Sequence, residues 1–366
     1  MRIKCKAKDL VKKLQRVNSI IGKAKLYPVL SNVIFDVKNE GSLTLYATDF
    51  ELCIIENLNV NLEREGSIGV PCAKLTEILR ELKDGEVFLE ADEELNLELK
   101  WERAKYKLRG IDKSDYPKIP QVTLEEYVCV NKDIMKEILR KTMFAIATND
   151  PRKALEGAYF KLTPSKIEVV AMDGSRLAHI EREVEEANIS GEKSCIIPKR
   201  TLNELLKLLR EAESDVKIAI EGNEVIFKLE DTIFFSTTIE AEYPPYDISL
   251  RTDIVCELNK TEFLSALRRV SLMDKLKTVK LQFEEDQLRI TSSSPDYGEA
   301  EEIIDINLSG KPIVREFNAS LILDFLNSVD GEIISIGFNE ALGTNIFKDL
   351  SDENYFCIIM HLLEGK

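Results

Sequence analysis

The chain has 366 residues, of which 44% are hydrophobic and 31% charged, a composition typical of two or three compact globular domains. A net charge of −15 at pH 7 argues against a protein that attracts nucleic acid over its whole surface. The sequence has no apolar stretch long enough to span a membrane, no secretory signal, and seven scattered cysteines without a CxxC pair, which together predict a protein of the reducing cytoplasm.

The first third of the chain predicts a short strand, a helix, a pair of strands and a second helix. The strand is expected at residues 2–5 and the helix at 8–22, where apolar residues recur every three or four positions. Alternating strands are expected at 33–37 and 43–47, and the second helix at 72–82.

The same order of elements returns twice. In the second third we expect strand, helix, two strands, helix and two closing strands at 127–130, 131–147, 159–162, 167–171, 198–211, 216–220 and 225–229. In the last third we expect strand, helix, two strands and helix at 254–258, 259–272, 279–283, 288–291 and 319–328. Asn131 and Asn259 stand where the caps of their helices belong.

Two Tyr-Pro turns mark the boundaries of the repeat. They lie at Tyr116-Pro117 and Tyr243-Pro244, 127 residues apart. Repeats of this length are domain duplications and are too long for solenoid units. The fold class is therefore α+β, in three similar domains at 1–124, 125–249 and 250–366.

Charge is divided unevenly between helices and the rest of the chain. The six predicted helices carry, in chain order, net charges of +3, 0, +2, +2, +2 and −1, a total of +8, which leaves −23 on strands and loops. Basic helices facing a phosphate backbone and an acidic outer surface would suit a ring around DNA. Lysine-rich helix faces that simply contact solvent are the alternative.

Several strings, in order along the chain, resemble one family. Asp173-Gly174-Ser175-Arg176-Leu177-Ala178 is similar to the D-G-x-R-L-A string of the bacterial DNA polymerase III beta subunits, the DNA sliding clamps. Further matches are Asn149-Asp150-Pro151-Arg152, Leu155-Glu156-Gly157, Pro28-Val29-Leu30-Ser31-Asn32, Thr48-Asp49-Phe50-Glu51, Glu299-Ala300-Glu301-Glu302, Phe317-Asn318 and Asp324-Phe325-Leu326.

The resemblance implies a fold and a function. Two copies would join head to tail into a ring of six domains with twelve helices around the hole. The ring would encircle duplex DNA without reading its sequence and would tether the replicative DNA polymerase and repair proteins. A clamp loader would open it, and the clamp itself would need no cofactor or metal and would catalyse nothing.

The family's pocket for partner peptides carries over to one set of positions. These are Met172, Gly174, Ser175, Arg176, Leu177, Pro244, Ile248, Asn318, Leu321, Ile359 and Met360. Glycine admits a peptide backbone, Leu177 and Ile359 offer an apolar cleft, and Arg176 is expected to bond a peptide carbonyl. Met360, Ser175 and Leu321 depart from the family's usual proline, histidine and tyrosine, which predicts an altered peptide preference.

Two further sets follow from the resemblance. The predicted DNA contacts are Lys23, Lys25, Asn149, Arg152, Lys153, Lys199 and Arg200, with Ala24 in place of the family's arginine. The predicted dimer contacts are Tyr106 and Leu108 on one side and Val270 and Leu272 on the other, with Ser271 between the latter two where a larger aliphatic residue is common.

Two other classes of function compete with this one. Only two histidines exist, and the common nucleotide-binding glycine motifs are missing from the sequence. Acidic clusters at 284–286 and 90–94 are expected to be solvated turns, although a magnesium-dependent nuclease would need such groups. A monomeric peptide-binding scaffold that has lost the ring is the second alternative.

Overall fold

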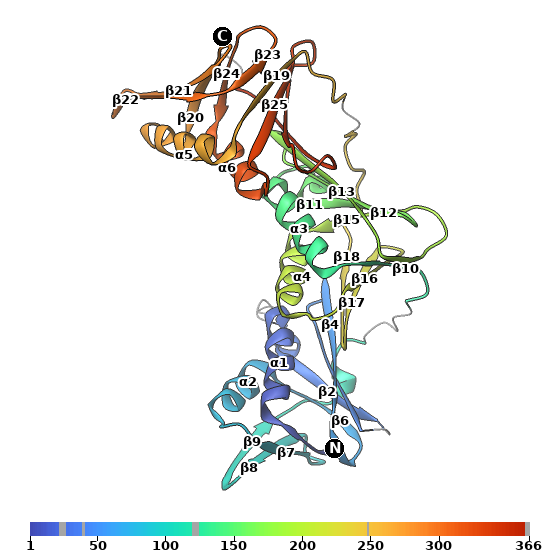
Figure 1. The fold of residues 1–366 in the computed structure, drawn as a ribbon. Coiled ribbons are helices and arrows are strands. Elements are labelled where there is room, and N and C mark those ends of the chain that lie inside the picture. The colour runs from blue at the N-terminus through green and yellow to red at the C-terminus, as the bar shows by residue number, and fades with distance from the viewer. Residues whose placement is uncertain (22–26, 39–40, 119–123, 247–248, 363–366) are drawn as a thin grey trace. The chain divides into compact units, whose positions relative to one another are not determined.

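The computed structural model describes residues 1–21, 27–38, 41–118, 124–246 and 249–362 (Figure 1). The chain forms two compact units, each with one nine-stranded sheet, one smaller sheet and helices. The first unit consists of Met1–Lys132, Glu185–Gly191 and Arg200–Thr238, and the second of Asp133–Val184, Glu192–Lys199 and Ile239–Lys366.

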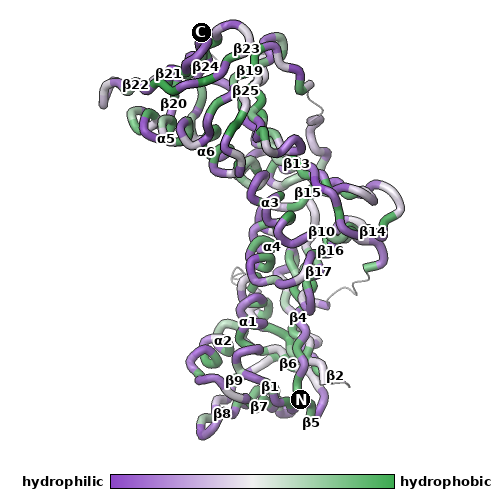
Figure 2. The backbone as a smooth tube through the Cα atoms, in the orientation of Figure 1, coloured by the Kyte–Doolittle hydropathy of each residue, from purple (hydrophilic) through white to green (hydrophobic). Residues whose placement is uncertain are grey.

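All six predicted helices are present in the structure. They are α1 (Ala7–Ile21), α2 (Cys72–Glu81), α3 (Lys132–Thr142), α4 (Lys199–Glu211), α5 (Lys260–Val270) and α6 (Ala319–Ser328). The predicted cap of α5 is confirmed, since the Asn259 side chain accepts a hydrogen bond from the backbone of Glu262. The cap predicted at Asn131 stays a prediction. In Figure 2 the helices carry both hydrophilic and hydrophobic residues, as amphipathic helices do.

One helix is shorter than its sequence pattern suggested. The apolar spacing extends to residue 147, but α3 ends at Thr142 and the chain continues as the 3-10 turn η3 (Met143–Ala145). The other short turns are η1 (Pro28–Ser31), η2 (Lys113–Asp115), η4 (Lys153–Glu156) and η5 (Ser271–Met273). Among the described residues no helix is long and apolar enough to cross a membrane.

Unit one contains two antiparallel sheets. The five-stranded sheet has the order β5 (Asn61–Arg64), β1 (Arg2–Lys6), β7 (Glu86–Ala91), β8 (Asn96–Trp101), β9 (Ala104–Arg109). The nine-stranded sheet has the order β14 (Glu186–Asn188), β10 (Tyr127–Val130), β16 (Val216–Glu221), β17 (Glu224–Leu229), β18 (Thr232–Thr237), β4 (Leu52–Asn59), β3 (Ser42–Thr48), β2 (Asn32–Lys38), β6 (Gly66–Pro71).

Unit two follows the same plan. Its nine-stranded sheet has the order β15 (Lys193–Pro198), β11 (Gly157–Leu162), β12 (Lys166–Met172), β13 (Arg176–Glu183), β27 (Tyr355–Ile359), β26 (Thr344–Asp349), β25 (Ile333–Asn339), β19 (Ile254–Asn259), β23 (Asn307–Ser309). Its four-stranded sheet has the order β22 (Gly298–Asp305), β21 (Gln287–Ser294), β20 (Thr278–Phe283), β24 (Ile313–Asn318).

Each nine-stranded sheet joins strands of two neighbouring repeats. In unit one, β18 from the second repeat pairs antiparallel with β4 from the first, with Phe234 opposite Ile54. In unit two, β27 from the third repeat pairs with β13 from the second, with Ile358 opposite Leu177. Neighbouring repeats are therefore fused through backbone hydrogen bonds, and the domain limits expected from the sequence stay a prediction.

The helices pack on the sheets through their apolar sides. Helix α1 contacts α2, β3 and β4, and α5 contacts α6, β21 and β22; Figure 1 shows α5 and α6 side by side on the four-stranded sheet. Burial is not purely apolar, because Glu56 on β4 is fully buried and meets Lys13 of α1 at 2.8 Å. Thr232 of β18 donates a hydrogen bond to the same carboxylate, so this cluster ties two repeats together.

A second buried ion cluster lies in unit two. Lys141 at the end of α3 is 1% exposed, and its ammonium lies 2.6 Å from Glu137 and 2.7 Å from Asp352. Arg182 of β13 binds the same two carboxylates. Burial acts to raise the pKa of Glu137 and of Asp352, but hydrogen bonds from Arg182 and Lys141 outweigh it, and both pKa values fall below their ordinary range.

Candidate functional site

The site begins at a tight turn that occurs in two repeats. In unit two, Oδ1 of Asp173 accepts hydrogen bonds from the backbone of Ser175 at 2.9 Å and of Arg176 at 3.0 Å. In unit one, Oδ1 of Asp49 accepts from the backbone two and three residues further on, at 3.2 and 2.9 Å. A short acidic side chain that bonds its own backbone in this way fixes the turn.

The second residue of both turns has a left-handed backbone. Gly174 has a φ of +89°, and in the other turn Phe50 has a φ of +77°. Glycine takes this conformation without strain, whereas the φ of Phe50 carries a steric cost. A Cβ atom at position 174 would lie 2.8 Å from Nη2 of Arg152, so the glycine also makes room for that guanidinium.

Beside the turn, the outer face of the nine-stranded sheet carries an apolar cluster. Four buried residues from four strands form it: Val170, Leu177, Ile346 and Ile358. Half-buried residues pack around them: Tyr159, Met172, Tyr243, Tyr246 and Phe356. Met172 and Leu177 were expected here from the sequence, but the two isoleucines and Val170 were missed.

The C-terminal strand presents a different residue from the one expected. Ile359 was predicted in the apolar cleft, yet Ile358 is the residue opposite Leu177 in the register and the one that packs against it. Ile359 is fully buried, and successive side chains of a strand point to opposite faces of the sheet. Met360 is 42% exposed, and its backbone donates to the carbonyl of Ser175 at 2.8 Å.

Arg176 is held by bonds within the chain. Its guanidinium binds Asp173 at 3.0 Å, Asp324 of α6 at 2.6 Å and the carbonyl of Phe144, so each of its three nitrogens already donates. These bonds use three of the five guanidinium N–H groups, and the expected bond to a peptide carbonyl stays a prediction for the other two. The same contacts bring α6 to the turn, and the predicted residues Asn318 and Leu321 lie at the start of that helix, where Asn318 is the cap.

Four of the predicted DNA contacts that the structure describes, Arg152, Lys153, Lys199 and Arg200, are bonded to groups within the chain. Arg152 binds Asp150 at 3.0 Å, Lys153 binds Glu156 at 2.9 Å, and Lys199 donates to the carbonyl of Ile146 at 3.0 Å. Arg200 pairs with Asp49 and Glu51, and Asn149 has a φ of +58°. Lys23 and Lys25, like Ile248 of the peptide site, lie outside the described residues.

The predicted dimer contacts fall on an edge strand and a helix end. Tyr106 and Leu108 lie on β9, an edge strand, where Tyr106 is 37% exposed. Val270 and Ser271 are 1% and 2% exposed in their own unit, so they offer little surface, whereas Leu272 is 71% exposed.

The acidic clusters serve local turns. Asp92 accepts hydrogen bonds from Asn96 and Glu94, and Glu284 accepts from the amides of Gln282 and Gln287. A third group was not predicted from the sequence: Glu168, His179 and Glu181 bring ligand atoms within 4.8 Å of one another on β12 and β13. In the structure Nε2 of His179 lies 3.0 Å from Glu168, and Glu181 pairs with Lys166.

Three repeats of one α+β plan, fused pairwise through their sheets, define a DNA clamp fold. The DNA polymerase III beta subunit family matches the chain in three segments, its N-terminal domain over residues 1–120, its central domain over 129–245 and its C-terminal domain over 251–362. The chain belongs to this family and is a DNA sliding clamp.

Known proteins agree with this assignment. The beta sliding clamp of Vibrio cholerae is 28% identical over 98% of this chain and 99% of its own length. The DNA polymerase sliding clamp of Bacillus subtilis, whose crystal structure is known, is 25% identical and superimposes over 100% of both chains with a TM-score of 0.93. The DNA polymerase III subunit beta of Pseudomonas aeruginosa, 23% identical, has the same fold with a TM-score of 0.93 over 100% of both chains.

Proposed function

We propose that two copies of this clamp close head to tail into a ring around duplex DNA in the cytoplasm. In this proposal the ring tethers the replicative DNA polymerase and other partners through short peptides, a clamp loader opens it, and the chain catalyses no reaction. The observation that carries the proposal is the way in which the three repeats are joined.

Two equivalent strand pairings, called joints below, connect the repeats, and the chain carries both edge strands that a third such joint would need. Each repeat contributes two runs of strands, one that ends at β9, β18 or β27 and one whose outermost strand is β4, β13 or β22. In both joints the first kind of end strand pairs with the second kind from the preceding repeat: β18 with β4, and β27 with β13. Among the described residues, the strands that have no partner at these positions are β9 of the first repeat and β22 of the third, both edge strands. Unpaired edges favour pairing with another chain, and a second copy supplies the missing partner of each.

The two free edges carry opposite charges. Strand β9 presents Lys105 and Lys107, and β22 presents Glu299 and Glu301. The hairpins before β9 and β18 correspond closely, since Glu102 and Glu230 both have a positive φ at the turn.

If β9 pairs with β22 as β18 pairs with β4, each lysine falls opposite a glutamate, Lys105 with Glu301 and Lys107 with Glu299. Opposite charges across a strand pair favour the match, and like charges disfavour β9 with β9 or β22 with β22. Head-to-tail closure is thus favoured over symmetric pairing of equal edges.

The peptide site is proposed at the turn and the apolar cluster of unit two. Gly174 has no side chain and lets the Arg152 guanidinium lie beside the turn, and Leu177 with Ile358 offers an apolar floor. A Pseudomonas aeruginosa clamp, 23% identical to this chain, is known bound to griselimycin. Griselimycin is therefore a suitable probe, and we expect it to bind this chain and to lose affinity in Leu177→Asp.

The ring itself is tested by its retention on DNA. Protomers separated in mild denaturant are returned to native buffer with a nicked circular plasmid, and the bound fraction is isolated by gel filtration. A closed ring stays on the circle in high salt and is lost when a restriction enzyme linearises the plasmid, because its ends then allow the ring to slide off. Equal loss before and after linearisation would contradict encirclement. A magnesium-dependent nicking assay on the supercoiled form of that plasmid tests the absence of nuclease activity.

A further inference from the structure

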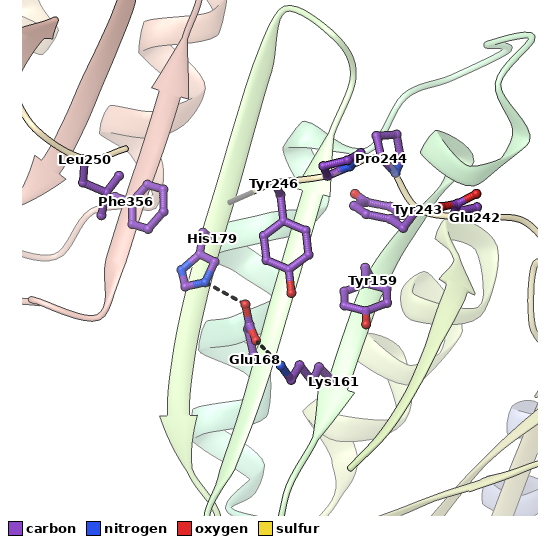
Figure 3. A pocket seen from close by; sticks show the side chains of 11 residues that line it. Tyr159, Lys161, Glu168, His179, Glu242, Tyr243, Pro244, Tyr246, Leu250 and Phe356 are labelled. Carbon is purple, nitrogen blue, oxygen red and sulfur yellow. Dashed lines mark hydrogen bonds and ion pairs between the residues drawn. The ribbon is translucent and has the colours of Figure 1, made fainter. Parts of the chain in front are cut away.

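A pocket of about 690 Å³ lies beside the proposed peptide site on the outer face of the sheet in unit two (Figure 3). Strands β11, β12, β13 and β27 form its floor, and residues 242–246 with Leu250 form its wall. Pro244 also belongs to the predicted peptide site, and four of the aromatic lining residues pack around the apolar cluster of that site, whereas Lys161, Glu168, His179 and Glu242 have no role in it so far.

Aromatic rings dominate the lining of this pocket. Tyr159 and Tyr243 are stacked with ring centroids 5.3 Å apart, and Tyr246 lies 5.7 Å from Tyr159. On the opposite side the ring of His179 stacks on Phe356 at 4.7 Å. Figure 3 shows Tyr246 between His179 and the pair formed by Tyr159 and Tyr243. The faces of aromatic rings carry negative partial charge and attract cations.

Carboxylates stand beside the rings. Glu168 lies on the floor, 15% exposed, and Glu242 lies on the wall. The hydrogen bond from His179 lowers the pKa of Glu168, with Tyr246 and Lys161 acting in the same direction against the effect of burial, so this carboxyl is ionised at neutral pH. Lys161 also lines the pocket, but its ammonium is closer to Glu192, at 3.1 Å, than to Glu168, at 3.9 Å. The lining therefore keeps an excess of negative charge.

The pocket is continuous with the apolar cluster of the peptide site. Four of its rings, those of Tyr159, Tyr243, Tyr246 and Phe356, pack directly against the cluster formed by Val170, Leu177, Ile346 and Ile358. A peptide that places an apolar side chain on the cluster thus has the pocket within reach of a neighbouring residue.

We propose that this pocket receives a basic side chain of a partner peptide, with arginine preferred, while an apolar residue of the same peptide occupies the cluster. The proposal rests on the proposed peptide site. A planar guanidinium stacks on tyrosine faces and bonds a carboxylate with two parallel N–H groups, which suits the rings around Glu168 better than a compact ammonium does. Partners of this clamp would accordingly be selected by charge as well as by apolar anchors.

The test compares fluorescein-labelled peptides that share the core Leu-Ala-Leu-Phe and carry arginine, lysine or citrulline at one flanking position in turn. Citrulline matches arginine in shape but has no charge. We expect arginine at one position to bind about tenfold more tightly than citrulline, or ~1.4 kcal/mol, with lysine between them. In Glu168→Gln we expect this preference to fall below about threefold, from the loss of one charged partner.

A matched control separates the pocket from general charge effects. Glu183 lies exposed at the end of β13, away from the pocket, and Glu183→Gln should leave the arginine preference unchanged. Equal binding of arginine and citrulline peptides, or a preference that survives in Glu168→Gln, would overturn the proposal while griselimycin binding upholds the peptide site. If neither griselimycin nor any peptide binds, the peptide site fails and this inference fails with it.

Discussion

Gly174 holds its turn through a conformation that other residues adopt at a cost. Gly174→Ala should lower the free energy of unfolding by about 1 kcal/mol because of the positive φ, and its new Cβ should displace Arg152. Gly191→Ala is the matched control, since Gly191 also has a positive φ but its Cβ would meet no described atom within 4 Å. Urea unfolding should show a similar loss in both variants, whereas griselimycin affinity should fall only in Gly174→Ala. Equal affinities would remove position 174 from the site.

Lys141 is the buried cation on which one ion cluster depends. Lys141→Met fills the same space but leaves Glu137 and Asp352 with Arg182 alone, and removing one partner of a buried ion pair destabilises a protein by about 3 kcal/mol. Lys136→Met on the same helix removes an exposed pair with Asp133 and should change stability by less than about 0.5 kcal/mol. Thermal unfolding should give a clearly lower melting temperature for Lys141→Met than for Lys136→Met. Similar melting temperatures would show that the buried ion cluster contributes little to stability.

At the scale of elements, the same cluster joins α3 to β13 and to the segment before β27, and it makes this joint sensitive to acid. The pKa values of Glu137 and Asp352 are lower in the folded chain than in the unfolded one. The two carboxylates therefore contribute fully to the free energy of unfolding when the pH is above their pKa values in the unfolded chain, about 4. This contribution is lost as the pH falls through their lower pKa values in the folded chain. Urea unfolding from pH 7 to pH 3 should show this decline, with a smaller decline in Glu137→Gln. If stability falls equally with pH in the unaltered chain and in Glu137→Gln, the acid sensitivity belongs to other carboxyl groups.

Element types were predictable from the sequence, but the face of the last strand was not. The helices and most paired strands follow from periodicity, because each exposes one side to solvent. Residues 357–359 are all apolar, so their alternation gives no signal, and only the pairing of Ile358 with Leu177 shows which of them reaches the peptide site. Ile359 therefore stays a predicted site residue, while the structure adds Ile358, Ile346 and Val170 to the apolar cluster.

At the scale of the whole molecule, ring closure should depend on the charges of the free edges. The double change Lys105→Glu and Lys107→Glu places like charges opposite Glu299 and Glu301 and should yield monomers. Light scattering across a dilution series would measure this, with a mass near twice 41.7 kDa expected for the unaltered chain.

Reversal of the opposite edge provides the complementary control. Glu299→Lys with Glu301→Lys should be monomeric alone, and mixing both double variants should restore a mixed dimer with one joint of unaltered charges and one joint in which both signs are reversed. Failure of the mixture to associate would contradict the proposed pairing of β9 with β22.

The threefold plan was visible in the sequence because each repeat has the same element order and two of them end in Tyr-Pro. The sharing of sheets was not, since β4 and β18 lie far apart in the sequence and carry no mutual signal before they are paired. The engagement of Arg152, Lys153 and Arg200 with nearby carboxylates was also hidden, because sequence shows charge but not its partners.

The pairing of β9 with β22 gives the proposed dimer two identical junctions, and two junctions behave differently from a single one. When one opens, the other keeps the released edges at a high effective concentration, so reclosure is an intramolecular step and is far faster than the meeting of two free protomers. In the proposed ring, the expected clamp loader would need to separate only a single junction, whereas complete dissociation would require both junctions to be open at once. A clamp can thus be quick to open for DNA and still slow to fall apart.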